Sequence, residues 1–205
     1  MASRHHVLIT GTGRAGTSFL IQLLTNLGLD TGFTPDGLHL DPIANAGLEY
    51  DVRAAGAPYV VKNPWLCDYI EDVLTDSSIH IDHVIIPVRN FDAAAASRAR
   101  VQEINTGCKD GGAGVAGGLW HTEKAADQAA VLRGRFTALI EALVKFDIDI
   151  TFLWYPRLTE DADYLLSKLR HALPMPNDDT FHSIFQATVR RDWVHQFGEA
   201  DRAPR

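Results

Sequence analysis

Three groups of residues in this sequence have the types and spacing needed to bind an anionic ligand. The first is the glycine-rich run Gly11–Ser18, which follows the apolar run His6–Thr10. Gly11, Gly13 and Gly16 allow the backbone to turn tightly and to approach a ligand without a Cβ clash. If a helix follows, its first N–H groups have no partner within the helix and carry the positive end of its dipole. A phosphate group binds well at such a position.

The spacing of this run, G-x-x-x-x-G-x-S, nearly matches the P-loop of nucleotide-binding proteins. Thr17 occupies the place where the P-loop has lysine, and a cation stands earlier, at Arg14. We therefore predict a phosphate-binding turn formed by Gly13, Arg14, Ala15, Gly16, Thr17 and Ser18. The alternative is a glycine turn with a purely structural role.

The second and third groups follow two later apolar runs. Lys62 ends the run Pro58–Lys62, and Arg89 follows the run His83–Val88. Each run predicts a buried strand. The carboxyl ends of parallel strands meet at one edge of a sheet, where ligands bind, so Arg14, Lys62 and Arg89 are expected to converge on one crevice. Three cations there indicate a ligand with more than one negative group.

Ser97 lies eight residues after Arg89, on a helix predicted to begin at a cap formed by Asp92 and to end near Asn105. If the helix packs back against the strand, Ser97 lies close to Arg89, and an arginine with a hydroxyl group forms a phosphate clamp. The alternative is an arginine paired with a nearby carboxylate and a serine on the helix surface.

The elements that must position these residues alternate between strand and helix. Apolar runs predict strands over 6–10, 58–62, 83–88 and 148–155. Amphipathic patterns predict helices over 19–27, 65–75, 92–105, 121–146, 160–173 and 180–196. This order predicts an α/β fold with three α/β/α layers and a central parallel sheet, of the P-loop nucleotide-binding type, in one domain over residues 1–205. We expect a long functional loop over 29–58, a flexible loop over the six glycines of 107–118 and a polar tail over 199–205.

The composition excludes several classes of protein. The formal net charge of −7 over 205 residues argues against a nucleic-acid-binding protein, whose surface is basic. No apolar run is long enough to span a membrane. The two cysteines indicate a reducing compartment, and we expect a cytoplasmic protein. No His-x-x-x-His or Cys-x-x-Cys pair is present, so we expect no metal; His5 and His6 are interpreted as terminal residues rather than ligands. The sequence does not predict the oligomeric state.

Two of these motifs together resemble the sulfotransferases that use 3′-phosphoadenosine-5′-phosphosulfate (PAPS), in particular bacterial members. The 5′-phosphosulfate loop of that family is similar to Gly13–Leu20, and its 3′-phosphate site is similar to Arg89-Asn90 with Ser97. Lys62-Asn63-Pro64 also looks like the Lys-Asp-Pro that follows the second strand in many bacterial members. The resemblance covers roughly residues 5–100. The late Arg-Lys-Gly loop of the family has no clear counterpart here.

The resemblance implies a transfer of SO₃ from PAPS to a hydroxyl or amine of a small-molecule acceptor, without a metal ion. It implies that Arg14 contacts the bridging oxygen and the 5′-phosphate, that the turn through Ser18 holds that phosphate, and that Arg89 and Ser97 hold the 3′-phosphate. Lys62 is a candidate contact for the transferring sulfonate; the alternative is a surface lysine at the end of a strand. The candidates for the general base are, in order, Glu49, His39 and Asp51. Aromatic residues are candidates to line the acceptor pocket: Tyr50, Tyr59, Trp65, Trp120 and Trp154.

Two other functions stay open. A P-loop small-molecule or nucleoside kinase explains Gly11–Ser18, but it needs a lysine in the turn and an acidic residue at a strand end for magnesium. Here Asp82 precedes its predicted strand, and the strand ends carry Lys62 and Arg89. The second possibility is a nucleotide-binding protein that has the fold but no catalytic activity, because a clear catalytic-base motif is missing.

Overall fold

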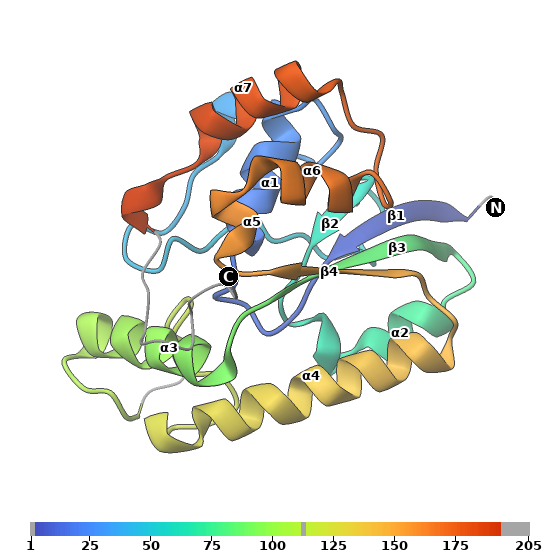
Figure 1. Cartoon of the computed structure of the whole chain (residues 1–205). Coiled ribbons are helices and arrows are strands. Elements are labelled where there is room, and N and C mark those ends of the chain that lie inside the picture. Colours follow the sequence, from blue (N-terminus) through green and yellow to red (C-terminus); the bar gives the residue numbers. More distant parts are fainter. Residues whose placement is uncertain (1–2, 112–113, 194–205) are drawn as a thin grey trace.

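A four-stranded parallel sheet forms the centre of the fold. The computed structural model describes residues 3–111 and 114–193 (Figure 1). The sheet has the order β2-β1-β3-β4 and all its neighbouring strands are parallel. The strands are β1 (Arg4–Ile9), β2 (Val60–Lys62), β3 (Ile79–Val88) and β4 (Ile150–Trp154). The predicted α/β fold with a parallel sheet is confirmed.

Helices cover both faces of this sheet and complete a three-layer α/β/α arrangement (Figure 1). One face carries α1 (Thr17–Asn26), α5 (Arg157–Glu160), α6 (Ala162–Leu169) and α7 (Asp178–Thr188). The other face carries α2 (Ile70–Thr75) and α4 (Gln128–Lys145), and α3 (Phe91–Thr106) packs beside α4. No helix in the described parts of the chain is long and apolar enough to cross a membrane.

The alternation of side chains along β1 divides the core into two halves. Val7 and Ile9 face the layer of α1, where they belong to the same buried cluster as Leu20. Leu8, between them, faces the opposite layer and shares a cluster with Leu139 of α4. All five side chains have at most 1 % of their surface exposed. Burial on both faces explains why β1 is a continuous apolar run.

Strand β3 is longer than predicted and contains a β-bulge. The register runs from His6↔Ile81 directly to Val7↔His83, so Asp82 is an extra residue without a partner on β1. Ile79 and Ile81 lie in the same buried cluster as Val84 and Ile86, because the extra residue changes the parity of the strand. The prediction that β3 starts at His83 was wrong, and Asp82 lies within the strand rather than before it.

Several helix boundaries also differ from the prediction. Asn90, not Asp92, caps α3, because its side chain accepts hydrogen bonds from the N–H groups of Asp92 and Ala93. The helix predicted over 121–146 begins only at Gln128, after a 3₁₀ turn over Ala125–Asp127.

Three further segments form shorter elements than predicted. Residues 65–75 form a 3₁₀ turn over Leu66–Asp68 and then α2. Residues 160–173 include the end of α5 and the separate helix α6. The helix predicted over 180–196 is α7 followed by a 3₁₀ turn over Arg191–Trp193. Residues 194–196 and the tail predicted over 199–205 lie outside the described residues.

The two predicted loops lack strands and α-helices in their described parts. Residues 29–58 contain a single 3₁₀ turn, Pro35–Gly37. Residues 107–111 and 114–118 have no helix or strand, and 112–113 lie outside the described residues.

The connections of β1 and β3 diverge at the carboxyl edge of the sheet. β1 leads into α1 on one face, whereas β3 leads into α3 and α4 on the other (Figure 1). Since β1 and β3 are neighbours, their following loops separate and leave a crevice between them. The turn Gly11–Gly16 and Arg89 lie at this topological switch point.

Two buried histidines predict that acid destabilises the fold. Burial lowers the pKa of His6 and of His83 below the ordinary value of 6.5. At pH values between the lowered and the ordinary pKa, the unfolded chain therefore binds more protons than the folded chain. The free energy of unfolding consequently falls as the pH falls through that window. His6 Nδ1 lies 2.7 Å from the Pro58 carbonyl oxygen, and its buried Nε2 is without a hydrogen-bond partner in the described structure.

Urea unfolding at about pH 7.5 and about pH 5 measures this effect. His83→Gln is expected to reduce the difference between the two free energies of unfolding, because glutamine does not titrate. The exposed residue His39, which is not among the charges that act on His83, provides a matched control: His39→Gln is expected to leave that difference unchanged. If the free energy of unfolding changed equally between the two pH values in the wild type and in His83→Gln, His83 would not be a source of the acid sensitivity.

Candidate functional site

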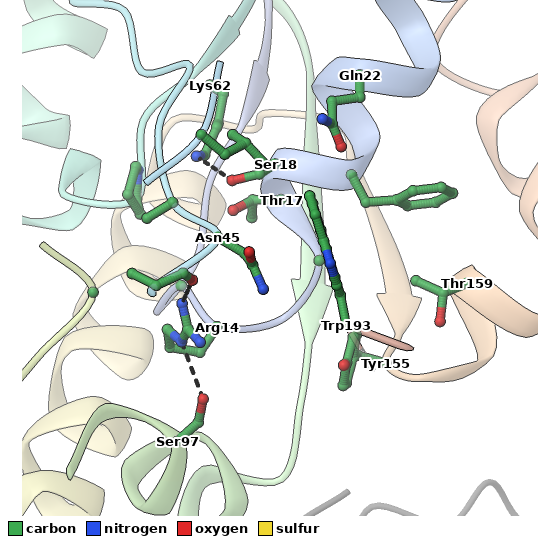
Figure 2. Close-up of a pocket in the computed structure, with 18 of the residues that line it drawn as sticks. Arg14, Thr17, Ser18, Gln22, Asn45, Lys62, Ser97, Tyr155, Thr159 and Trp193 are labelled. Carbon is green, nitrogen blue, oxygen red and sulfur yellow. Dashed lines mark hydrogen bonds between the residues drawn. The ribbon is translucent and has the colours of Figure 1, made fainter. Parts of the chain in front are cut away.

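A single pocket at the switch point collects most of the predicted site residues (Figure 2). It holds about 1040 Å³ of empty space, counted out to its open mouth. The predicted residues that line it are Gly13, Arg14, Gly16, Thr17, Ser18, Glu49, Lys62, Arg89 and Ser97. The side chain of Ala15 is instead buried in the core beside α1. Arg14, Lys62 and Arg89, which follow three different strands, therefore line one pocket as expected.

Left-handed backbone conformations shape the turn between β1 and α1. Gly13 has a φ of 70°, and a Cβ there would lie 2.9 Å from Nη2 of Arg98. Gly16 has a φ of 86° and is the N-cap of α1, without a side-chain cap. The first turn of α1 contains no acidic residue. Its N–H groups and dipole therefore favour an anion in the pocket.

Arg14 lies in the middle of the pocket wall and holds together two segments that are distant in sequence. Its Nε donates a hydrogen bond of 3.1 Å to Ser97 Oγ on α3, and its Nη1 donates to the Ala44 carbonyl oxygen (Figure 2). Burial, together with the nearby charge of Arg89, lowers the pKa of Arg14 to about 10. The guanidinium is still protonated at neutral pH, and a bound anion would relieve the repulsion between the two arginines.

Arg89 contacts the turn itself. Its side chain is 4 % exposed, and its Nη1 donates a hydrogen bond of 3.1 Å to the carbonyl oxygen of Arg14. The guanidinium carbon lies 4.6 Å from the centre of the Tyr155 ring, which is cation–π distance. Ser97 and Arg89 line the same pocket, and Ser97 Oγ accepts the hydrogen bond from Arg14.

A fourth cation, Arg98, was not predicted from the sequence. It is 5 % exposed, and its two Nη atoms donate to the carbonyl oxygens of Gly118 and Thr12, at 2.8 and 2.7 Å. Its Nε is buried without a hydrogen-bond partner in the described structure, and burial lowers its pKa to about 9. Arg98 thus joins the turn after β1 to the end of the glycine-rich segment. Gly117 of that segment also lines the pocket.

Lys62 is the most deeply buried cation and connects three segments. It is 2 % exposed, and its Nζ donates to Ser18 Oγ at 2.9 Å, to the Gly47 carbonyl oxygen at 2.5 Å and to Glu49 Oε1 at 2.7 Å (Figure 2 shows the first). These bonds use all three N–H groups of the ammonium. Burial lowers the pKa of Lys62, and the attraction of Glu49 partly opposes that shift.

Of the candidate bases, Glu49 alone lines the pocket. His39 is exposed, and Asp51 forms an ion pair of 2.8 Å with Arg53; neither lines the pocket. Glu49 is also the one carboxylate among the described pocket-lining residues, against several arginines and Lys62. The electrostatics of the site therefore favour an anion over a hydrated divalent cation.

The aromatic residues of the pocket are mostly not those that were predicted. Trp65 lines it as expected, whereas Tyr50, Tyr59, Trp120 and Trp154 do not. Tyr155 and Trp193 do, and Figure 2 shows both on the side of the pocket opposite Arg14 and Lys62. Trp193 follows α7, near the end of the described chain. No pattern in the first hundred residues predicts that it lies near the glycine turn.

Comparisons with known proteins give no match: no family model matches the chain, and no curated protein or solved structure does so either. The functional interpretation therefore depends on the residues and the geometry of the pocket.

Proposed function

We propose that this chain is a PAPS-dependent sulfotransferase that acts on a hydroxyl or amine of a small molecule. The observation that supports this most is the meeting of the uncapped α1 N-terminus with Arg14, Arg89 and Ser97 in one pocket. PAPS carries two separate phosphate sites, and the pocket offers two adjacent groups of anion donors.

Each donor group has a distinct task in this proposal. The backbone N–H groups of Gly16, Thr17 and Ser18 hold the 5′-phosphate, and the hydroxyls of Thr17 and Ser18 add contacts. Arg14 stabilises the negative charge that develops on the bridging oxygen. Arg89 and Ser97 hold the 3′-phosphate. Because the cations are already fixed by hydrogen bonds, the pocket needs little reorganisation during the reaction.

The reaction moves an SO₃ group from the phosphosulfate to the acceptor oxygen or nitrogen. The bond between sulfur and the bridging oxygen breaks, and its electron pair stays with the 5′-phosphate of adenosine 3′,5′-bisphosphate. Glu49 takes the proton of the acceptor; its Oε1 is the atom bonded to Lys62, which leaves Oε2 for this role. Lys62 thereby orients the base.

A kinase explains this pocket less well. Magnesium bound to ATP needs carboxylate ligands, and Glu49, the one carboxylate among the described lining residues, is paired with Lys62. Asp82 is near the amino end of β3, where it interacts with His5, so it lies at the wrong end of the strand. A protein that binds the bisphosphate without turnover is the second candidate, favoured by the ion pair of Glu49.

A thermal-shift titration with adenosine 3′,5′-bisphosphate, run beside ATP with magnesium, tests the proposed ligand. At a hundred times its Kd a ligand adds about 2.7 kcal/mol to the free energy of unfolding, which raises Tm by several degrees. Arg89→Ala is expected to remove this shift. Arg133→Ala, which changes an exposed arginine paired with Asp92, is the matched control and is expected to retain it.

The possible results separate the three functions. A shift with the bisphosphate that requires Arg89 supports the sulfotransferase, and turnover of PAPS then distinguishes it from a protein that only binds. A shift with ATP and magnesium alone would assign the pocket to a kinase. No shift with either ligand would refute the proposal.

A further inference from the structure

A second group of side chains with ligand chemistry lies at the amino edge of the sheet, away from the pocket. It consists of His5 on β1 and of His80 and Asp82 on β3. His5 Nδ1 is 2.7 Å and His80 Nε2 is 3.6 Å from Asp82 Oδ1. One ligand atom from each residue lies within 4.8 Å of the other two. The two imidazole rings are 4.6 Å apart between their centres.

The sheet itself brings these residues together. His5 and His80 are register partners on neighbouring strands, so their Cα atoms are fixed by the backbone ladder. Asp82 is the extra residue of the bulge in β3. A bulge redirects a side chain away from the regular alternation, and here the redirected carboxylate meets both imidazoles.

The packing of β3 does not require the additional residue that forms the bulge. Without residue 82, Ile81 and His83 would be consecutive, and regular alternation would place Ile79, Ile81, Val84 and Ile86 on the one face where they are buried now. The additional residue therefore contributes its carboxylate beside His5 and His80, while the apolar pattern gains nothing from it.

A neighbouring group orients this carboxylate. Tyr59 donates a hydrogen bond of 3.2 Å from its hydroxyl to Asp82 Oδ2, so Oδ1 is the oxygen directed at the histidines. Metal sites in proteins use such second contacts to orient their ligands. In a tetrahedral zinc site with bonds of about 2.0–2.1 Å, ligand atoms are about 3.3 Å apart, which small side-chain rotations reach from the present distances.

We propose that His5, His80 and Asp82 bind one divalent first-row transition ion, with Zn²⁺ as the reference ion. Imidazole nitrogens and a carboxylate oxygen are ligands that suit such an ion. The ion takes the place of the hydrogen-bond contact between His5 Nδ1 and Asp82 Oδ1, and solvent completes its coordination, because His5 and His80 are exposed. The bound ion links β1 to β3 at the edge opposite the pocket.

Titration of the chelator-treated full chain with ZnCl₂, followed by calorimetry, tests this proposal. We expect one ion per chain and a rise in Tm, because the ion binds the folded chain. His80→Ala is expected to weaken binding at least tenfold, and Tyr59→Phe about tenfold by releasing Asp82. His171→Ala removes an exposed histidine outside the cluster and is expected to leave binding unchanged.

Titration with Co²⁺ gives a readout that does not depend on stability. Cobalt bound by imidazole and carboxylate absorbs visible light more strongly and at other wavelengths than hydrated Co²⁺, and this change is expected in the wild type and His171→Ala but not in His80→Ala. Circular dichroism shows whether His80→Ala is folded, and Asp82→Asn repeats the test at another ligand. Absence of uptake by the wild type, or equal affinity in the wild type and both ligand variants, would overturn the proposal. Neither result bears on the bisphosphate pocket.

Discussion

Arg14→Ala is expected to lower the rate of the proposed sulfuryl transfer by about a hundredfold to a thousandfold, which corresponds to about 3–4 kcal/mol in the transition state. The reason is the position of the guanidinium, which lies in the pocket beside the α1 N-terminus and is fixed by Ser97 and Ala44. Loss of a preorganised donor affects the charge that develops on the leaving oxygen more than it affects substrate binding.

The measurement is the formation of adenosine 3′,5′-bisphosphate from PAPS, with an acceptor identified by screening. Arg14→Lys keeps a positive charge and is expected to retain more activity than Arg14→Ala. Arg89→Ala is expected to act chiefly on KM for PAPS. Thermal unfolding shows whether the loss of the Arg14 hydrogen bonds has changed the fold. A kcat for Arg14→Ala equal to that of the wild type would remove Arg14 from the mechanism.

Lys62→Met is expected to lower the free energy of unfolding by about 3 kcal/mol, the lower end of the range for a buried ion pair, because Lys62 is 2 % exposed but the Glu49 carboxylate that loses its partner is 23 % exposed. The carbonyl oxygen of Gly47 and the hydroxyl of Ser18 lose the same donor. For a chain of this size the loss corresponds to a fall in Tm of roughly 10 °C. Urea unfolding and calorimetry measure both quantities.

Two controls separate burial from simple loss of charge. Lys145→Met breaks an exposed ion pair of 3.0 Å with Glu71 and is expected to cost less than about 1 kcal/mol. In the double variant Lys62→Met/Glu49→Gln, removal of the unpaired charge is expected to restore part of the stability. If Lys62→Met cost no more than Lys145→Met, the three-way connection made by Lys62 would contribute little to the fold.

The sequence predicted the features that depend on local pattern. Glycine spacing between an apolar run and an amphipathic run predicted the turn before α1, and the alternation of strands and helices predicted that the sheet is parallel. The carboxyl-edge rule then placed Arg14, Lys62 and Arg89 around one pocket. These predictions concern the order of strands, turns and helices along the chain, which short runs of residues largely determine.

Features that depend on contacts between distant segments were missed. Arg98 is fixed by the carbonyl oxygens of Thr12 and Gly118, and no spacing near Arg98 signals either contact. The interpretation of His5 as a terminal residue missed the cluster with His80 and Asp82 for the same reason: the strand register, not the sequence spacing, brings them together. Polar residues in the first part of β3 also concealed a half-buried strand.

The late start of α4 has a similar cause. The Gln128 side chain accepts from the N–H of Trp120 and donates to its carbonyl oxygen, at 2.7 and 3.1 Å. His121, which follows Trp120, has a φ of 55°, a left-handed backbone conformation that is incompatible with a helix. A glutamine in an amphipathic run normally favours helix continuation, so this side-chain pairing with the backbone was not foreseeable from propensity.

The place of β1 in the sheet also determines the order in which the chain matures during synthesis. β1 leaves the ribosome first of the four strands, yet its two neighbours are β2, which starts at Val60, and β3, which starts at Ile79. Its apolar faces and its unpaired N–H and C=O groups stay uncovered until both neighbours have been translated. Such long-range parallel pairing is slow to form and exposes the nascent chain to aggregation. Chaperone binding during translation is therefore expected to prevent aggregation of the nascent chain chiefly before β3 emerges.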